Sequence, residues 1–273
     1  MENALLQEFI IPFNGIKKKT VYHFSDSHLT TFDELSDNLE IEKAVKATEA
    51  WEGVRKGFCE AYGKPYGEFE KQNPKKHFLD LLTISEHGDA LVLAGDTLDY
   101  INGSNLRLFE SVFEDYDIPF VAVCGNHEPI KQIPDGYIFS KSKQPIQKLD
   151  LGDMVIIGID NSARTITKEQ LDILNKELNN GKPVLIVMHV PIMTKGNKER
   201  LEKSGVYFQL NYEGCPKENL DFIELLSSNS KKIIAVLAGH LHYSDESEIS
   251  DGLMQYVSSQ GITGNINRYI IGE

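Results

Sequence analysis

Five short, mainly apolar segments of this chain are each followed directly by side chains that bind metals or transfer protons. The segments have the length and residue types of buried strands in an α/β sheet. They are residues 20–24, 90–94, 118–124, 183–188 and 232–238. The side chains that follow them are Asp26 and His28, Asp96, Asn126 and His127, His189, and His240 and His242. Because α/β folds bind ligands at the carboxyl ends of their strands, we expect these side chains to meet at one edge of a mixed sheet.

The third segment leads into the sequence GNHE, residues 125–128, which sets an amide, an imidazole and a carboxylate side by side. Taken alone, this sequence fits a Gly-Asn turn with a surface histidine as well as it fits a functional site. The pair Asp26 and His28 is equally weak evidence in isolation, since polar residues often follow strands. Recurrence of the pattern at five strand ends favours a site.

The candidate ligands are carboxylates and imidazoles with one neutral amide. This mixture suits borderline divalent metals such as Mn, Fe, Zn or Ni, and it differs from the oxygen-only ligands of calcium. The ligands are too many for one ion, whereas two ions that share a bridging carboxylate would use all of them. Metal pairs roughly 3.5 to 4 Å apart are the usual device for phosphoryl transfer. We therefore expect two divalent metal ions as the cofactor.

Length and charge restrict the class of protein. A chain of 273 residues, 41% of them hydrophobic, can bury one substantial core, and we expect a single domain over residues 1–273. The formal net charge is −13, and no Lys/Arg cluster reverses it, so nucleic acids and anionic membranes are disfavoured as partners. No apolar run reaches membrane-spanning length, and the first twenty residues lack the features of a secretory signal.

Cysteine usage indicates a reducing compartment. Cys59, Cys124 and Cys215 are odd in number and widely spread, which argues against a disulfide framework and predicts a cytoplasmic location. Cys124, within an apolar segment, is expected to be a small core residue.

Residues 30–87 are expected to form a helical and loop insertion after the first site segment. Thr30 or Thr31 can cap a first helix, whose apolar positions recur at helical spacing from Leu35 onward, and Trp51 is expected in its core face. A loop over residues 63–72 follows, rich in Gly, Pro and aromatic residues. Asn73-Pro74 then begins a second helix. The aromatic residues near this loop have two open roles, substrate contact and packing on the domain, and they are Tyr62, Tyr66 and Phe69.

The rest of the chain carries local signals for further elements. Thr167 and Gln170 form a capping box for a helix that ends at Asn180-Gly181. Residues 146–149 and 154–159 read as a hairpin, and residues 194–215 as an irregular stretch. Helices are expected near residues 105–113 and 218–226. From Tyr243 onward the sequence alternates as an antiparallel set does, with Asp251-Gly252 as a hairpin turn.

The order of the motifs, DSH, GD, GNHE, H and GHLH, spans Asp26 to His242 and resembles the calcineurin-like metallophosphoesterase family. Each motif is weak alone, and the combination is highly specific. The resemblance implies an α/β fold, a two-sheet mixed β-sandwich flanked by helices, with a dinuclear metal centre at the strand ends. Carried over by motif, the ligands of one metal are Asp26, His28 and His242, those of the other are Asn126, His189 and His240, and the bridging ligand is Asp96. His127 corresponds to the family's non-ligand catalytic histidine, and Asp99 to the carboxylate that often orients it.

The function that follows is hydrolysis of a phosphate mono- or diester of a small molecule by a metal-activated hydroxide, with His127 as general acid. Glu128-Pro129 departs from the Asp of many relatives and from the Arg of some protein phosphatases, which argues against protein-phosphatase activity. No arginine clamp for phosphate lies within the motifs. Asn211 and Tyr212 are candidate substrate contacts, with an ordinary loop as the alternative. Two alternatives stay open, a catalytically silent binding scaffold and a nuclease.

Overall fold

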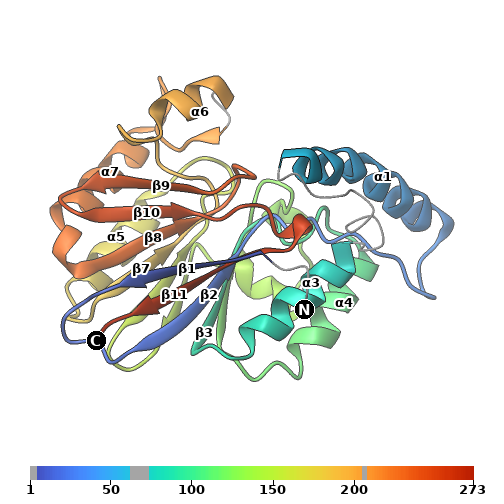
Figure 1. The fold of residues 1–273 in the computed structure, drawn as a ribbon, viewed down its shortest axis with the longest axis horizontal. Coiled ribbons are helices and arrows are strands. Elements are labelled where there is room, and N and C mark those ends of the chain that lie inside the picture. Colours follow the sequence, from blue (N-terminus) through green and yellow to red (C-terminus); the bar gives the residue numbers. More distant parts are fainter. Residues whose placement is uncertain (1–4, 62–73, 205–207) are drawn as a thin grey trace.

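Two mixed β-sheets pack face to face, and helices cover their outer faces (Figure 1). The computed structural model describes residues 5–61, 74–204 and 208–273. The first sheet has the order β1 (Leu5–Ile11), β11 (Asn265–Ile271), β2 (Lys19–Phe24), β3 (Ala90–Ala94) and β4 (Phe120–Val123). The second has the order β5 (Ile146–Asp150), β6 (Val155–Ile159), β7 (Val184–Val187), β8 (Ile233–Ala238), β10 (Leu253–Val257) and β9 (Asp245–Ser250). This architecture confirms the expected α/β sandwich.

The five site strands are divided between the two sheets. Strands β2, β3 and β4 run parallel in the first sheet, and β7 and β8 run parallel in the second. The hairpins β5–β6 and β9–β10 are antiparallel, as predicted. The expectation of a wholly antiparallel tail was wrong, because β10 pairs with β8 in parallel and β11 pairs with β1 in parallel. The alternation of apolar and polar residues within a segment does not show which distant strand that segment pairs with.

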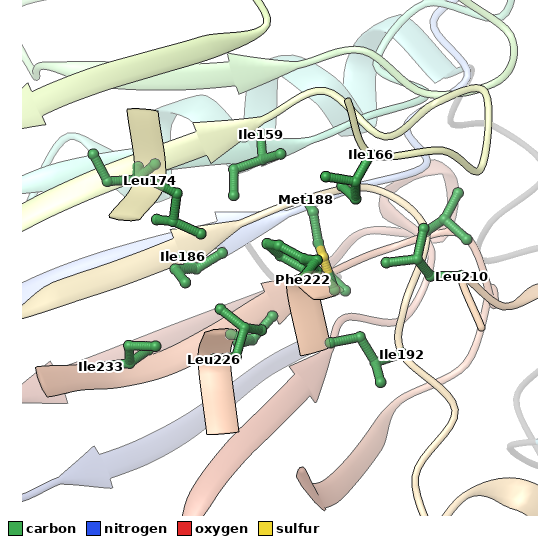
Figure 2. Close-up of a cluster of buried hydrophobic side chains, with 14 of the residues drawn as sticks. Ile159, Ile166, Leu174, Ile186, Met188, Ile192, Leu210, Phe222, Leu226 and Ile233 are labelled. Carbon is green, nitrogen blue, oxygen red and sulfur yellow. The ribbon is translucent and has the colours of Figure 1, made fainter. Parts of the chain in front are cut away.

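The apolar strands are buried on both faces, which explains why they lack polar positions. In β7, Val184 and Ile186 join the core under the helices of the second sheet, whereas Leu185 and Val187 join the core between the sheets. Figure 2 shows the helix-side core, where Ile186 lies with Phe222 and other aliphatic side chains. Alternate residues of a strand point to opposite faces, so a strand between two cores is apolar throughout.

Helices α3 (Pro74–Ser85) and α4 (Gly103–Phe113) cover the first sheet, and α5 (Lys168–Leu178) and α7 (Lys217–Ser228) cover the second. Phe78 and Leu81 of α3 and Phe109 of α4 are fully buried against the first sheet. Helices α1 (Asn38–Ala61) and α6 (Lys198–Ser204) project from the same side of the molecule (Figure 1). None of the described helices is long and apolar enough to cross a membrane.

The first helix begins later than the sequence suggested. It starts at Asn38, and Asp37 caps it: the Oδ1 of Asp37 accepts the backbone N–H of Glu40 at 2.8 Å. Thr30 and Thr31 were wrongly predicted as its cap, because they bond to the α4 side of the fold: the hydroxyls of Thr30 and Tyr100 lie 2.9 Å apart, and the N–H of Thr31 donates to Asn105. Two apolar positions assigned to the helix's inner face, Leu35 and Leu39, are 71% and 75% exposed.

Other local predictions had mixed outcomes. The Thr167–Gln170 capping box is present at the start of α5, and Cys124 is fully buried. The stretch 194–215 was expected to be irregular and contains α6. Three features named from the sequence lie outside the described residues. They are the loop over residues 63–72 with its Tyr66 and Phe69, the neighbouring Tyr62, and the predicted cap Asn73.

Candidate active site and metal centre

The carboxyl ends of the five site strands meet at one edge of the sandwich. Within each sheet, a backbone hydrogen bond joins neighbouring strand ends. In the first sheet the N–H of Asp26 donates to the carbonyl of Gly95 at 3.0 Å, and in the second the N–H of Gly239 donates to the carbonyl of His189 at 3.0 Å. Three groups of potential metal ligands form there among the described residues. One of them joins His28 to Asp99 and His127, and the other two consist of predicted ligands alone. The first cluster is Asp26, His28 and His242, and the second cluster is Asp96, His189 and His240. All seven residues predicted as ligands lie here, since Asn126 Oδ1 is 3.2 Å from His189 Nε2.

The first cluster contains polar atoms without ordinary partners. The Nε2 atoms of His28 and His242 are 3.2 Å apart, while His28 Nδ1 faces Asp99 at 3.1 Å. The buried Oδ1 of Asp26 accepts no hydrogen bond within the described chain, although His242 Nε2 is 3.3 Å away. A proton on His28 Nδ1 leaves a lone pair on Nε2, so a positive charge near Nε2 would stabilise the cluster.

The second cluster is held by the backbone. His189 is fully buried, and its Nδ1 lies 2.8 Å from the carbonyl oxygen of Ala94, which makes Nδ1 the donor. Its Nε2 therefore points a lone pair or a proton toward Asp96 Oδ2, 3.3 Å away. Burial lowers the pKa of His189, but the carboxylates of Asp96 and Asp26 and the carbonyl of Ala94 together outweigh it and raise the pKa to about 9. The field at this position favours a cation, and a divalent ion could take the place of the proton.

The backbone at the site is strained in a specific pattern. Seven described residues other than glycine have positive φ, and five of them are candidate ligands: Asp26, His28, Asp96, His240 and His242. Such conformations cost about 1–3 kcal/mol each and persist where the surrounding fold enforces them. Glycine is needed beside them, since a Cβ on Gly125 would lie 2.1 Å from Asp96 Oδ1. These observations fit a centre whose ligands are aimed at common points, as bound metals require.

Asp99 connects the first cluster to His127. One carboxylate oxygen, Oδ1, lies 3.1 Å from His28 Nδ1 and 3.2 Å from His127 Nδ1. The hydrogen bond that His127 donates to the Asp99 carboxylate raises the pKa of His127 to about 9, although burial acts in the opposite direction. Asp99 therefore favours the protonated form of His127, whose ring lines a cavity of about 400 Å³.

Trp51 is a site residue that the sequence did not reveal. It was predicted to be core, but it is half-buried, and its indole N–H donates to Asp99 Oδ1 at 2.9 Å. Its ring centroid lies 4.0 Å from that of His28. Helical spacing gives an aromatic residue the same pattern whether its face meets the core or a site, so only the packing of α1 over the strand ends identifies it.

Glu128 is not exposed to the cavity, contrary to the expectation that it forms part of a chemical cluster with its neighbours in GNHE. It is fully buried, and its two oxygens accept the N–H groups of Leu98 at 2.7 Å and Gly125 at 2.8 Å. Burial, with the nearby charge of Asp96, raises its pKa to about 8. Glu128 thus ties the loop after β3 to the loop after β4.

The wall of the cavity contains a second residue that the motifs did not reveal. The cavity is lined by Asp96, Asn126, His127, Ser162, Arg164, Val190, Phe208, His240 and His242. Arg164 follows β6, outside every motif, and its guanidinium carbon lies 4.1 Å from the ring centroid of Tyr212. Asn211 bonds to both backbone groups of Met193, so these contacts give it a structural role. Tyr212 supports Arg164.

Comparison with known proteins agrees with this geometry. A family model described as calcineurin-like phosphoesterase matches residues 19–244. A search of curated proteins gave no match. Among solved structures, a dimetal phosphatase from Danio rerio is similar with a TM-score of 0.56 and 10% identity, over 90% of this chain and 88% of that one. A purple acid phosphatase from yellow lupin (Lupinus luteus) seeds is similar with a TM-score of 0.50 and 12% identity, over 93% of this chain and 45% of that one.

At these identities the two structures establish a shared fold. The family match is broader evidence, because it covers well over half of the chain and includes every candidate ligand. This chain therefore belongs to the calcineurin-like phosphoesterase family and is a metal-dependent phosphoesterase.

Proposed function

We propose that this protein is a dinuclear-metal phosphohydrolase that cleaves a phosphate mono- or diester of a small molecule. The observation that supports this most directly is the pair of ligand clusters beside one cavity. Asp26, His28 and His242 would hold one divalent ion. Asn126, His189 and His240 would hold the other, and Asp96 would bridge them. The ligand chemistry suits Mn, Fe, Zn or Ni.

Bound ions would activate a water as the attacking hydroxide and offset the negative charge of the phosphoryl group. The protein's own residues supply the remaining requirements. The backbone N–H of His127 donates to Asp96 Oδ1 at 2.8 Å, and the other oxygen, Oδ2, lies 3.3 Å from His189 Nε2, so the carboxylate that would bridge the ions is held at both oxygens. Asn126 contributes an oxygen without adding negative charge, so the centre stays positive enough to attract phosphate.

His127 is the proposed general acid. Its ring lines the cavity and stays protonated at neutral pH because Asp99 raises its pKa. A protonated imidazole at this position can donate to the ester oxygen as the P–O bond breaks. Asp99 is well suited to hold the ring, since burial raises its pKa but hydrogen bonds from His127, His28 and Trp51 lower it overall. Asp99 therefore remains an anion and orients His127.

The test combines elemental analysis of the purified protein with assays on an aryl phosphate and a bis-aryl phosphate. We expect about two equivalents of transition metal, as a dinuclear site requires, and metal-dependent hydrolysis of at least one ester. Bound metal without hydrolysis of either ester would favour the silent scaffold. Activity confined to nucleic acid would favour the nuclease. Full activity after complete chelation of metals would contradict the proposal.

A further inference from the structure

Among the residues that the structure describes around the cavity, Arg164 is the one lysine or arginine. The other charged or titratable residues there are Asp96 and the histidines His127, His240 and His242. In a protein of net charge −13, a guanidinium beside the candidate metal centre can recognise an anionic substrate. Its planar set of N–H donors matches the oxygens of a phosphoryl group.

The position of Arg164 is fixed by contacts from three parts of the chain. Its N–H donates to Asn161 at 2.7 Å, and its carbonyl oxygen accepts from Asn219 at 3.0 Å. The side-chain Nε donates to the carbonyl of Gln209 at 3.3 Å, and the guanidinium stacks on Tyr212. Asn161 also accepts the N–H groups of His189 and Val190, so the loop that carries Arg164 is held to the end of β7.

The backbone of Arg164 also distinguishes it from the other arginines described. It has φ of +59° and is one of the seven non-glycine residues with positive φ. Five of the others are candidate ligands, and Asp251 lies in the β9–β10 turn, where this conformation is ordinary. Arg164 closes the turn that begins at Asn161, and its positive φ is a further constraint that sets the direction of its side chain.

The wall beside Arg164 is apolar. Phe208 and Val190 line the same cavity, and the Phe208 ring centroid lies 5.2 Å from that of His240. A cavity of about 400 Å³ is at the small end of the usual range for small-molecule sites. Such a space accepts a phosphoryl group together with a compact apolar group.

We propose that Arg164 binds a terminal oxygen of the phosphoryl group and makes the site selective for phosphomonoesters that carry a compact aromatic or aliphatic group against Phe208. This inference rests on the proposed function. A monoester dianion offers three terminal oxygens and about two negative charges, as a phosphorylated side chain does. A diester has two terminal oxygens and one negative charge, so it gains less from an added guanidinium. Tyr212 is a positioning residue that holds the guanidinium plane.

The first measurement compares Arg164→Ala with wild type on an aryl phosphate and a bis-aryl phosphate. Charge-assisted hydrogen bonds are strong enough to predict a loss of about 10- to 100-fold in kcat/KM for the monoester. The loss for the diester should be several-fold smaller, and metal content should be unchanged. Arg164→Lys should recover only part of the loss, because an ammonium lacks the planar fork. Equal losses for both esters, or no loss, would overturn the proposal.

Arg200→Ala is the matched control. Arg200 also stacks on a tyrosine, with its guanidinium carbon 4.1 Å from the Tyr243 ring centroid, but it pairs with Asp245 outside the cavity. We expect its kinetics to match wild type. A comparable monoester-selective loss in Arg200→Ala would show that removal of any arginine produces the effect, and so would contradict a specific role for Arg164.

Inorganic phosphate binding separates this inference from the proposed function. The dissociation constant of phosphate, measured by calorimetry on metal-loaded protein, should rise about 10- to 100-fold in Arg164→Ala. If wild type hydrolyses neither ester but shows this change, the hydrolase proposal fails and Arg164 still binds phosphate. If wild type hydrolyses esters and phosphate affinity is equal in the two proteins, the Arg164 inference fails alone.

Discussion

The two ligand clusters differ in what holds them. In the first cluster, His28 faces the side chain of Asp99, which also accepts the indole N–H of Trp51 from α1. In the second, His189 bonds to a backbone carbonyl at the end of β3, and its own N–H bonds to Asn161. A side-chain carboxylate therefore faces the Nδ1 of His28, whereas a backbone carbonyl faces the Nδ1 of His189. A carboxylate partner makes a histidine ligand more basic than a carbonyl partner does, so the first cluster can be tuned by single substitutions.

The difference also separates the roles of the two surrounding walls. Asp99 couples the first cluster to His127, so we propose that this side supplies the proton. The wall beside the second cluster carries Arg164 and Phe208, so we propose that this side recognises the substrate. Replacements of Asp96, His127 and Trp51, with expected effects that decrease in that order, test this comparison.

Replacement of Asp96 should have the largest effect. By distance Asp96 belongs to the second cluster, but as a bridging ligand it serves both. We expect Asp96→Ala to lose activity and to bind less metal than any other single ligand variant, since two cations would then repel each other across an emptied bridge. Elemental analysis measures the metal content. Two full equivalents of metal in this variant would show that the clusters are independent sites.

Replacement of His127 should separate catalysis from metal binding. We expect His127→Gln to keep its metals and to slow hydrolysis of an alkyl ester by about a hundredfold to ten-thousandfold, the usual contribution of general acid catalysis. A nitrophenyl ester should lose much less, because its leaving group departs without a proton. Asp99→Asn should show a milder form of the same selectivity.

The measurement for His127 is the ratio of rate losses for the two esters at matched metal occupancy. Equal losses would instead assign His127 to charge stabilisation on the phosphoryl oxygens. Loss of metal in the variant would assign it to the ligands.

Replacement of Trp51 should have the smallest effect. Trp51→Phe keeps a ring over His28 but removes the N–H donor to Asp99. One hydrogen bond of this kind predicts an alkyl-ester rate about 3- to 10-fold lower than wild type. A larger decrease in the alkyl-ester rate together with loss of metal would show that Trp51 is needed for the structure of the metal site.

Trp51 also provides a direct readout of the first cluster, because it is the single tryptophan of the chain. Mn²⁺ bound by Asp26, His28 and His242 should quench its fluorescence. His28→Ala should remove most of that change, whereas His189→Ala should retain it. If both substitutions reduce the Mn²⁺-dependent change in fluorescence equally, the two clusters bind their ions together.

The sequence by itself determined the five strands that lead into the site and the residues at their ends. A strand buried on both faces must be apolar throughout, as in β3 and β7, and a polar ligand directly after it is a local signal. The capping box at Thr167 was predictable for the same reason, since it is set by residues three positions apart. The family resemblance supplied the division into two sheets and the roles of the ligands, and those roles stay predictions.

Only the tertiary structure decided which other residues reach the site. Trp51 meets Asp99 across 48 positions of sequence, and Arg164 is tied to Asn219 across 55. Glu128 turned away from the cavity because the N–H groups of Leu98 and Gly125 needed a buried acceptor. Each of these outcomes depends on how separate elements pack, and packing joins residues that carry no shared local pattern. The candidate ligands were therefore readable from the strand ends, whereas the cavity wall that carries Arg164 was visible only in the fold.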